Sequence, residues 1–189
     1  MTTDLRFRKN LISVADFVKT RDRLFCSGWA GPGEGKTYFC LGFPSPIYMY
    51  SFEPEGPLWA LRTALHNGLI EPDDVYVDEV IPNALKTGDF PLIRDTEEEH
   101  KIYDYFKDAV DYVCRTETQG TIAIDTGTTF NQITQEVEME EIVKKRKRQG
   151  KSEPYKFDFG HANRATKHFI DRLRASSMNL VIVHHAREK

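Results

Sequence analysis

The stretch "AGPGEGKT", residues 30–37, lies between two apolar segments and carries three glycines, one lysine and one threonine. It is close to the pattern G-x-x-x-x-G-K-[ST], in which glycines let the backbone curl so that its N–H groups point at phosphate oxygens. In such a loop Lys36 would reach the β- and γ-phosphates of a nucleotide, and Thr37 would bind magnesium. Ala30 stands where the pattern begins with glycine, and Gly31 follows at once. The stretch therefore predicts a phosphate-binding loop that opens a helix.

The segments around this loop alternate between strand patterns and helix patterns. Apolar runs predict strands at 23–29, 47–53, 74–81, 121–125 and 179–185, and the first of them is expected to be buried. Helix patterns cover 36–43, 56–68, 96–116, 131–149 and 161–177. This alternation predicts an α/β fold in which helices cover both faces of a mostly parallel sheet. We expect one domain over 1–189, with an N-terminal extension at 1–21 and a charged insertion at 131–158.

The composition limits the class of protein. A chain of 189 residues suits one domain, and its formal net charge of -3 gives no general attraction to nucleic acid. The three cysteines, Cys26, Cys40 and Cys114, form no C-x-x-C pair, which disfavours zinc and disulfide frameworks and favours a reduced, cytoplasmic location. No segment approaches the ~20 apolar residues of a membrane span, so no membrane partner is expected.

Two carboxylates follow predicted strands. Asp125 ends the apolar run "TIAID", where a carboxylate can hold magnesium together with Thr37; the alternative is a turn-capping aspartate. Glu53 closes the second strand, which we expect beside the strand of the loop, and it is a candidate to orient the attacking water. Glu55 is the rival, and a solvated acidic turn is the alternative for both. Three threonines are candidates to bond the Asp125 carboxylate or to sense the nucleotide: Thr126, Thr128 and Thr129.

Two adjacent histidines end the last predicted strand. Side chains alternate along a strand, so only one of His184 and His185 can face a nucleotide. His185 lies at the tip and is the expected detector of the γ-phosphate, whereas His184 is expected to be a buried histidine with satisfied hydrogen bonds. Metal binding by this pair is disfavoured because neighbouring strand residues point apart.

Taken together, the order of these parts resembles the RecA-like core of the P-loop ATPases. Within that group the chain is similar to phage-encoded AAA-type nucleotide-binding proteins, including the Sak-type single-strand-annealing recombinases, over residues 22–189. The resemblance makes "AGPGEGKT" a Walker A loop, "TIAID" a Walker B strand, Glu53 the catalytic glutamate and His185 the γ-phosphate switch residue, where the family often has glutamine. Further strands follow in the family, which implies that the sheet here is truncated at its C-terminal strands or is a minimal version.

The resemblance also implies a function and a set of site residues. It implies an ATPase that uses ATP and Mg²⁺, acts in phage DNA recombination or replication, and assembles into a homo-oligomeric ring or filament. The expected catalytic residues are Glu53, Lys36 and His185, and the expected magnesium ligands are Thr37 and Asp125. The remaining nucleotide contacts are expected from the loop: Ala30, Gly31, Pro32, Gly33, Glu34, Gly35, Lys36, Thr37 and Tyr38.

One dense basic run, "KKRKRQGK" at 144–151, is the candidate contact for single-stranded DNA. It lies roughly where the first DNA-facing loop of a RecA-like protein is found, and aromatic residues that could stack on bases follow it. The alternative is a solvated helix, because acidic residues precede the bases at the spacing of i, i+4 ion pairs. The cations concerned are Lys144, Lys145, Arg146, Lys147, Arg148 and Lys151.

Two other functions stay open at this point. The chain could bind ATP as an assembly switch with negligible hydrolysis, or it could be a small-molecule nucleotide phosphotransferase. The second would need an arginine-rich lid, and the basic run is rich in lysine instead. Four arginines are candidates to act across a subunit boundary: Arg164, Arg172, Arg174 and Arg187.

Overall fold

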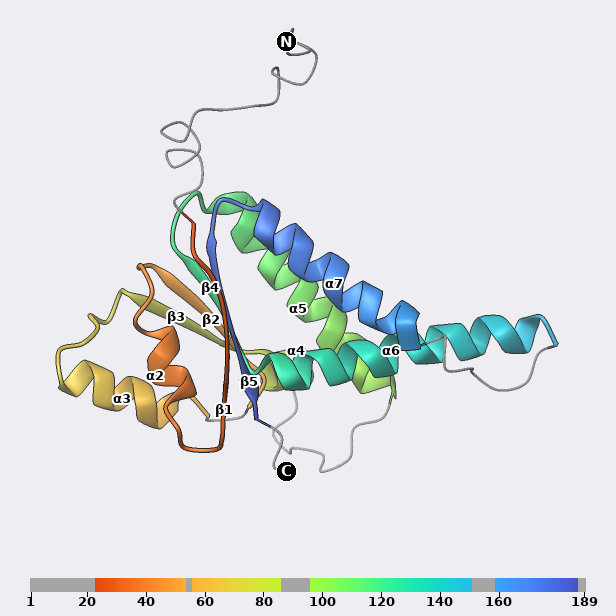
Figure 1. The fold of residues 1–189 in the computed structure, drawn as a ribbon, viewed down its shortest axis with the longest axis horizontal. Coiled ribbons are helices and arrows are strands. Elements are labelled where there is room, and N and C mark those ends of the chain that lie inside the picture. Colours follow the sequence, from red (N-terminus) through yellow and green to blue (C-terminus); the bar gives the residue numbers. More distant parts are fainter. Residues whose placement is uncertain (1–22, 54–55, 86–95, 151–158, 187–189) are drawn as a thin grey trace, which may run out of the picture.

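The computed structural model describes residues 23–53, 56–85, 96–150 and 159–186 (Figure 1). At its centre is a sheet of five parallel strands in the order β1-β5-β4-β2-β3. The strands are β1 (Phe25–Ala30), β2 (Ile47–Ser51), β3 (Val75–Glu79), β4 (Thr121–Asp125) and β5 (Asn179–His185). Since all five run the same way, their carboxyl ends meet at one edge, where open α/β sheets bind ligands. The predicted α/β class with a parallel sheet is confirmed.

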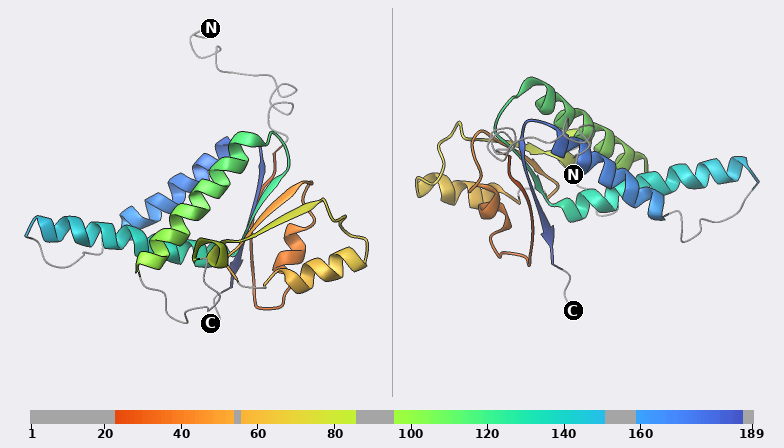
Figure 2. Two further views of the ribbon diagram at one scale, coloured as in Figure 1. Left: turned by 180° about the vertical axis from the view of Figure 1, so that it is seen from behind. Right: turned by 45° about the horizontal axis from the view of Figure 1, so that its top comes forward.

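The helices form a layer on each face of the sheet (Figures 1 and 2). One layer contains α2 (Lys36–Cys40) and α3 (Leu58–His66); the other contains α5 (Thr96–Thr116), α6 (Gly127–Arg148) and α7 (Phe159–Ala175). A short helix, α4 (Val80–Leu85), follows β3 directly and packs against α5. No helix in the described ranges combines the length and the apolar character that crossing a lipid bilayer requires.

Aromatic rings hold the larger of the two cores together. Phe106 of α5, Phe130 of α6 and Phe169 of α7 have ring centroids 4.9 to 5.3 Å apart, so one ring from each helix meets the other two. Phe52, just beyond β2, adds a fourth ring 4.9 Å from Phe106. Burying each such side chain contributes roughly 1.5–3 kcal/mol. This cluster therefore holds α5, α6 and α7 against the sheet. It also holds the end of β2, where Phe52 precedes Glu53.

The structure differs from the sequence prediction at β1. Its segment is apolar and was expected to be buried, but β1 is an edge strand, and within the described part of the chain only β5 lies beside it. Leu24, Phe25 and Trp29 are consequently exposed. An apolar run indicates a strand but cannot tell an edge from the middle of a sheet, because that depends on which strands pair with it.

Helix α6 also differs from its prediction. It begins at Gly127, earlier than the expected residue 131, because the Thr126 hydroxyl caps it by accepting from the Thr129 N–H. Its first turns belong to the core, where Phe130, Ile133 and Val137 are buried. The C-terminal end of the helix extends away from the body of the molecule (Figure 1). The first part of the predicted insertion is thus an integral element of the fold, and 151–158 lie outside the described residues.

Candidate active site

The glycine-rich loop joins the end of β1 to the start of α2. Gly33 and Gly35 have φ angles of 74° and 84°, which side-chain-bearing residues rarely adopt, so glycine is required at both positions. Ala30 is still part of β1: it pairs in register with His185, and its carbonyl accepts from the Ala186 N–H at 3.0 Å. Extended backbone needs no glycine, which explains how the loop forms although Ala30 replaces the first glycine of the pattern.

Two charged side chains of the loop fold back onto its backbone. The Gly31 N–H donates to Glu34 Oε2 at 2.5 Å, and Lys36 Nζ donates to the Gly31 carbonyl at 3.0 Å. The Glu34 carboxylate here takes the place that an anionic ligand oxygen would take on a loop N–H. The Gly31 N–H thus already donates to a negatively charged oxygen, and the Lys36 ammonium group is held beside it.

Asp125 and Thr37 meet below the loop. The Thr37 hydroxyl donates to Asp125 Oδ2 at 2.7 Å, so the two expected magnesium ligands are in direct contact. Asp125 is only 3% exposed because β4 lies inside the sheet with helices on both faces. This burial raises the pKa of the Asp125 carboxyl, and the hydrogen bond from Thr37 opposes the rise. The pair is a compact, partly desolvated oxygen site of the kind that Mg²⁺ prefers.

Glu53 reaches the same edge from β2. The expectation that β2 lies beside β1 is wrong, since β5 and β4 separate them; β2 instead pairs with β4, and the Phe52 N–H donates to the Asp125 carbonyl at 2.7 Å. Gly56 closes the turn after Glu53, where a Cβ would come within 2.8 Å of Glu53 Cβ. The rival Glu55 lies outside the described residues.

His185 faces Glu53, and the two side chains are hydrogen-bonded through Nε2 and Oε1. The backbone N–H of His185 donates to the Thr128 hydroxyl at 2.9 Å, which ties the tip of β5 to the first turn of α6. Thr128 therefore contacts the histidine, and in the described part of the chain none of the three threonines hydrogen-bonds to the Asp125 side chain. His184 is stacked on Trp29 instead, and burial lowers its pKa.

These side chains converge on one cavity of about 270 Å³. The predicted residues that line it are Pro32, Gly33, Gly35, Lys36, Thr37, Tyr38, Glu53, Asp125 and His185. Sequence reasoning missed Trp59, which also lines the cavity and is 75% exposed. The available signal was its position: a tryptophan on the helix that directly follows the Glu53 turn.

The basic segment, residues 144–148, lies on the protruding C-terminal end of α6. Lys144 is paired: its Nζ is 3.0 Å from Glu140 Oε2 and 3.6 Å from Glu141 Oε1, as in the solvated-helix alternative. The hydrogen bond from Lys144 holds the pKa of Glu140 below its usual value. Lys145, Lys147 and Arg148 are exposed and, among the described residues, have no ion pair. Lys151 and the first of the following aromatic residues lie outside the described ranges.

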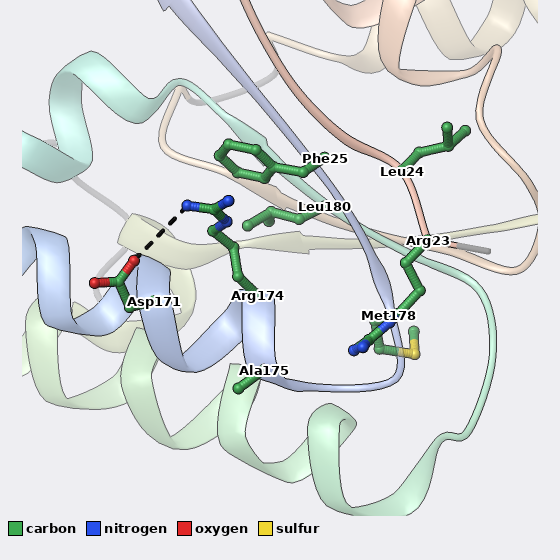
Figure 3. A pocket seen from close by; sticks show the side chains of 8 residues that line it. All are labelled: Arg23, Leu24, Phe25, Asp171, Arg174, Ala175, Met178 and Leu180. Atoms are coloured by element: carbon green, nitrogen blue, oxygen red, sulfur yellow. Dashed lines mark ion pairs between the residues drawn. The ribbon is translucent and has the colours of Figure 1, made fainter. Parts of the chain in front are cut away.

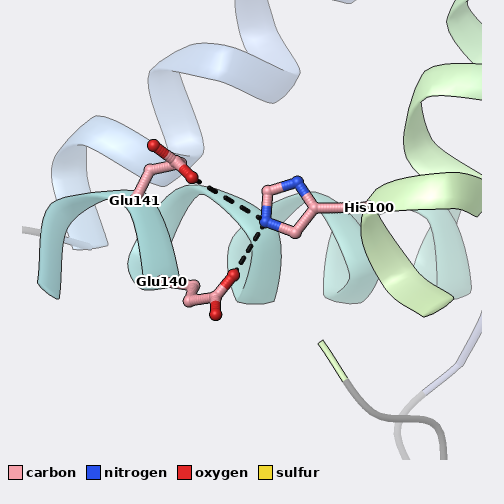
Figure 4. Close-up of side chains that lie close together, drawn as sticks. All are labelled: His100, Glu140 and Glu141. Carbon is pink, nitrogen blue, oxygen red and sulfur yellow. Dashed lines mark hydrogen bonds and ion pairs between the residues drawn. The ribbon is translucent and has the colours of Figure 1, made fainter. Parts of the chain in front are cut away.

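His100 of α5 joins the same acidic pair (Figure 4). Its Nε2 lies 2.8 Å from Glu140 Oε2 and 4.0 Å from Glu141 Oε1. The three side chains resemble a metal-binding set, but Lys144 already meets both carboxylates. The arrangement is therefore an ion-pair network that links α5 to α6.

The arginines predicted to act in trans have different partners. Arg172 binds both oxygens of Asp111 on α5 at 2.5 Å, so it is engaged within the chain. Arg174 lies over the Phe25 ring, 4.6 Å from its centroid, and Arg164 donates to the Gly160 carbonyl. Arg187 lies outside the described residues.

Comparison with known proteins supports the fold assignment. No protein-family model matches the chain, and neither does any curated protein sequence. A solved structure described as a prototypical ATPase from the type III secretion system of pathogenic bacteria resembles it with a TM-score of 0.50 and 12% sequence identity. The match covers 88% of this chain and 45% of that one, so this chain spans less than half of that structure's length. The chain thus has an α/β fold with a five-stranded parallel sheet that resembles a RecA-like ATPase domain.

Proposed function

We propose that the chain is a magnesium-dependent ATPase that acts on single-stranded DNA in phage recombination or replication. The observation that carries the proposal is the convergence of the glycine-rich loop, the Thr37–Asp125 pair and the Glu53–His185 pair on one cavity. A phosphate loop, a magnesium site and a water-orienting carboxylate are the parts that phosphoryl transfer to water requires.

The residues present fit ATP and magnesium. The loop amide that now meets the Glu34 carboxylate would donate to a phosphate oxygen, and Lys36 would exchange the Gly31 carbonyl for the β- and γ-phosphates. Thr37 and Asp125 would hold magnesium, which when bound neutralises the charge on the phosphate oxygens. Tyr38 and Trp59 line the same cavity and offer aromatic rings to the base.

In the proposed reaction Glu53 orients a water molecule and accepts its proton. The water oxygen bonds to the γ-phosphorus while the bond from that phosphorus to the β–γ bridging oxygen breaks, which yields ADP and inorganic phosphate. His185 is hydrogen-bonded to the Glu53 carboxylate, and in this proposal it detects the γ-phosphate. Because its backbone N–H bonds to Thr128, a change at His185 is passed directly to α6.

The DNA partner is supported by the exposed cations of the basic segment, at the far end of the helix that begins beside His185. We predict that single-stranded DNA stimulates ATP turnover, measured as phosphate release. Replacing Lys145, Lys147 and Arg148 together with alanine should abolish the stimulation and make the slope of log affinity against log salt shallower by about 2. Basal turnover without DNA should not change, since these residues lie outside the cavity.

Lys144→Ala is the matched control, because its ammonium is already paired and its loss should change DNA affinity much less. DNA binding that survives in the triple variant would contradict the assignment of this segment. Turnover that needs an added nucleoside monophosphate would indicate a phosphotransferase instead. Assembly into a homo-oligomeric ring or filament stays a prediction, and chromatographic mass with and without ATP tests it.

Trp59 gives a prediction for the base. Trp59→Ala should weaken ATP binding by about 5- to 150-fold, which is the range expected for losing one base–aromatic stack, whereas Trp59→Phe should keep most of the affinity. Calorimetric titration with ATP and magnesium measures both. Tyr112→Ala, on α5, removes an aromatic ring of similar exposure, 67%, far from the cavity and should leave the affinity unchanged. Equal affinities for all variants would contradict a stacking role.

A further inference from the structure

We call the cavity of about 270 Å³ that is lined by Lys36, Glu53 and Asp125 the nucleotide cavity. A second cavity, of about 490 Å³, lies beside it and shares His185 with it. We call it the aromatic cavity because Phe25, Trp29, Phe130 and His184 are among its lining residues. It is bounded by β1, β5 and residues of α6 and α7. Its volume falls within the roughly 300–1,000 Å³ of small-molecule sites, which combine apolar walls with a few convergent polar groups.

Trp29 and His184 form a rigid stacking platform in this cavity. Their ring centroids are 4.8 Å apart and their planes differ by 13°. Gly127 lets the start of α6 approach His184 closely, because a Cβ at that position would lie 2.7 Å from His184 Cε1. Although one face of the Trp29 ring is covered, the side chain is 66% exposed, so its other face is open to a planar ligand.

Polar groups in the cavity suit the edge of a heteroaromatic ring. The Thr166 hydroxyl donates to Asn131 Oδ1 at 3.0 Å, which leaves Asn131 Nδ2 without a partner among the described residues. Ser27 Oγ lies 3.1 Å from His184 Nε2, and burial keeps the pKa of that histidine low. An amide N–H and two hydroxyl groups beside an aromatic platform match a nucleobase better than the purely apolar ring of a phenylalanine.

Cationic groups lie next to the aromatic cavity. A neighbouring hollow of about 470 Å³ shares Phe25 with it and contains Arg23 and Arg174 (Figure 3). Arg174 lies over the Phe25 ring, and its ion pair with Asp171 is long, at 3.9 Å. Arg23 has no ion pair within the described ranges. Phe25 and Trp29 are four residues apart in β1, about 13 Å at the strand rise, so a strand with one base in the aromatic cavity would bring the backbone phosphate of a neighbouring nucleotide to the two guanidinium groups beyond Phe25.

We propose that this surface of β1 is a nucleic-acid subsite that holds one unpaired nucleobase on Trp29 and, further along the same strand, a backbone phosphate at Arg23 and Arg174. The ligand chemistry is an unpaired base together with a backbone phosphate of a neighbouring nucleotide, and its source is a single strand. The inference rests on the single-stranded DNA partner of the proposed function. It adds a contact about 24 Å along α6 from the basic segment, counting from Thr128 to Lys144 at the helical rise.

Tryptophan fluorescence tests the base contact. The chain has two tryptophans, so Trp59→Phe leaves Trp29 as the single reporter. A short oligothymidine strand should quench its emission in a saturable way, and an abasic strand of equal length should not. Quenching by free thymidine as well would support the base contact and make free nucleosides a second source. Equal quenching by the abasic strand or by phenylalanine amide, or no quenching by any probe, would overturn the proposal.

Affinity measurements separate the base from the phosphate. By anisotropy of a labelled strand, Trp29→Ala should weaken binding by about 5- to 150-fold, and Arg174→Gln should make the log–log salt slope shallower by about 0.7. Tyr112→Ala and Arg115→Gln, both on α5, are the matched controls and should bind as the parent does. Trp29 is exposed, so Trp29→Ala should fold, and circular dichroism checks this.

The two proposals fail in different ways. Lys36→Ala should keep the quenching of Trp29, since the aromatic cavity does not include the phosphate loop. If the triple variant of the basic segment loses DNA and Trp29→Ala does not, the subsite is wrong while the DNA partner stands. If oligothymidine binds to neither the parent chain nor its variants, both are wrong.

Discussion

Replacing Lys36 with alanine is expected to abolish ATP turnover and to weaken ATP binding by roughly 10²-fold or more, because a preorganised positive donor to the phosphates is lost. Lys36 is the one ammonium group among the residues that line the nucleotide cavity in the described structure. Its Nζ is already held beside the loop by the Gly31 carbonyl at 3.0 Å. Phosphate release and calorimetric titration with ATP measure the two effects.

The folded state should tolerate this change. Within the described residues the Lys36 side chain makes a single hydrogen bond, whose loss costs about 1 kcal/mol, so the melting temperature should change little. Lys167→Ala, an exposed lysine of α7, is the control for loss of one positive charge and should keep full turnover. Turnover that persists in Lys36→Ala would mean that the glycine-rich loop is not the nucleotide site.

The second large effect is expected at Glu53. Glu53→Gln should lower the turnover rate by about 10²- to 10⁴-fold, the usual contribution of a positioned general base. ATP affinity should stay within a few-fold of the parent, because glutamine has the same shape and can still hydrogen-bond to His185. Single-turnover kinetics together with equilibrium ATP titration separate the two quantities.

Glu71→Gln provides a matched control, since it makes the same change on an exposed loop away from the cavity. A parent chain that binds ATP with negligible turnover, and a Glu53→Gln variant that behaves identically, would favour the assembly switch over hydrolysis. A loss of ATP binding in Glu53→Gln would instead show that this carboxylate supports the cavity rather than the reaction.

Much of the site could be predicted because its signals are local in the sequence. The glycines at 33 and 35 mark positions that need positive φ, and Asp125 ends a buried strand. The parallel sheet then brings the ends of separate strands together, so Glu53 and His185 could be expected at one edge. Their direct hydrogen bond could not be predicted, because it depends on how β2 and β5 are placed around β4.

The rest depended on non-local packing. Strand order decides that β1 is an edge strand, so its apolar sequence gave a wrong prediction of burial. Charge pattern alone could not separate Lys144, which is paired with Glu140, from Lys145 one residue further on. Trp59 and Trp29 are both exposed tryptophans, and only the folded chain shows that they line two different cavities.

Helix α6 has a mechanical consequence. Its first turns are packed in the core and joined to His185 through Thr128, its middle is tied to α5 by the contact between Glu140 and His100, and only its C-terminal end stands away from the body. We expect such a helix to act as a lever arm with its pivot near Thr128. With Arg148 about 30 Å from the pivot at 1.5 Å per residue, a tilt of about 5° swings that end through about 3 Å. A movement of under an ångström beside the γ-phosphate would thereby become a displacement comparable to a hydrogen-bond length at the tip.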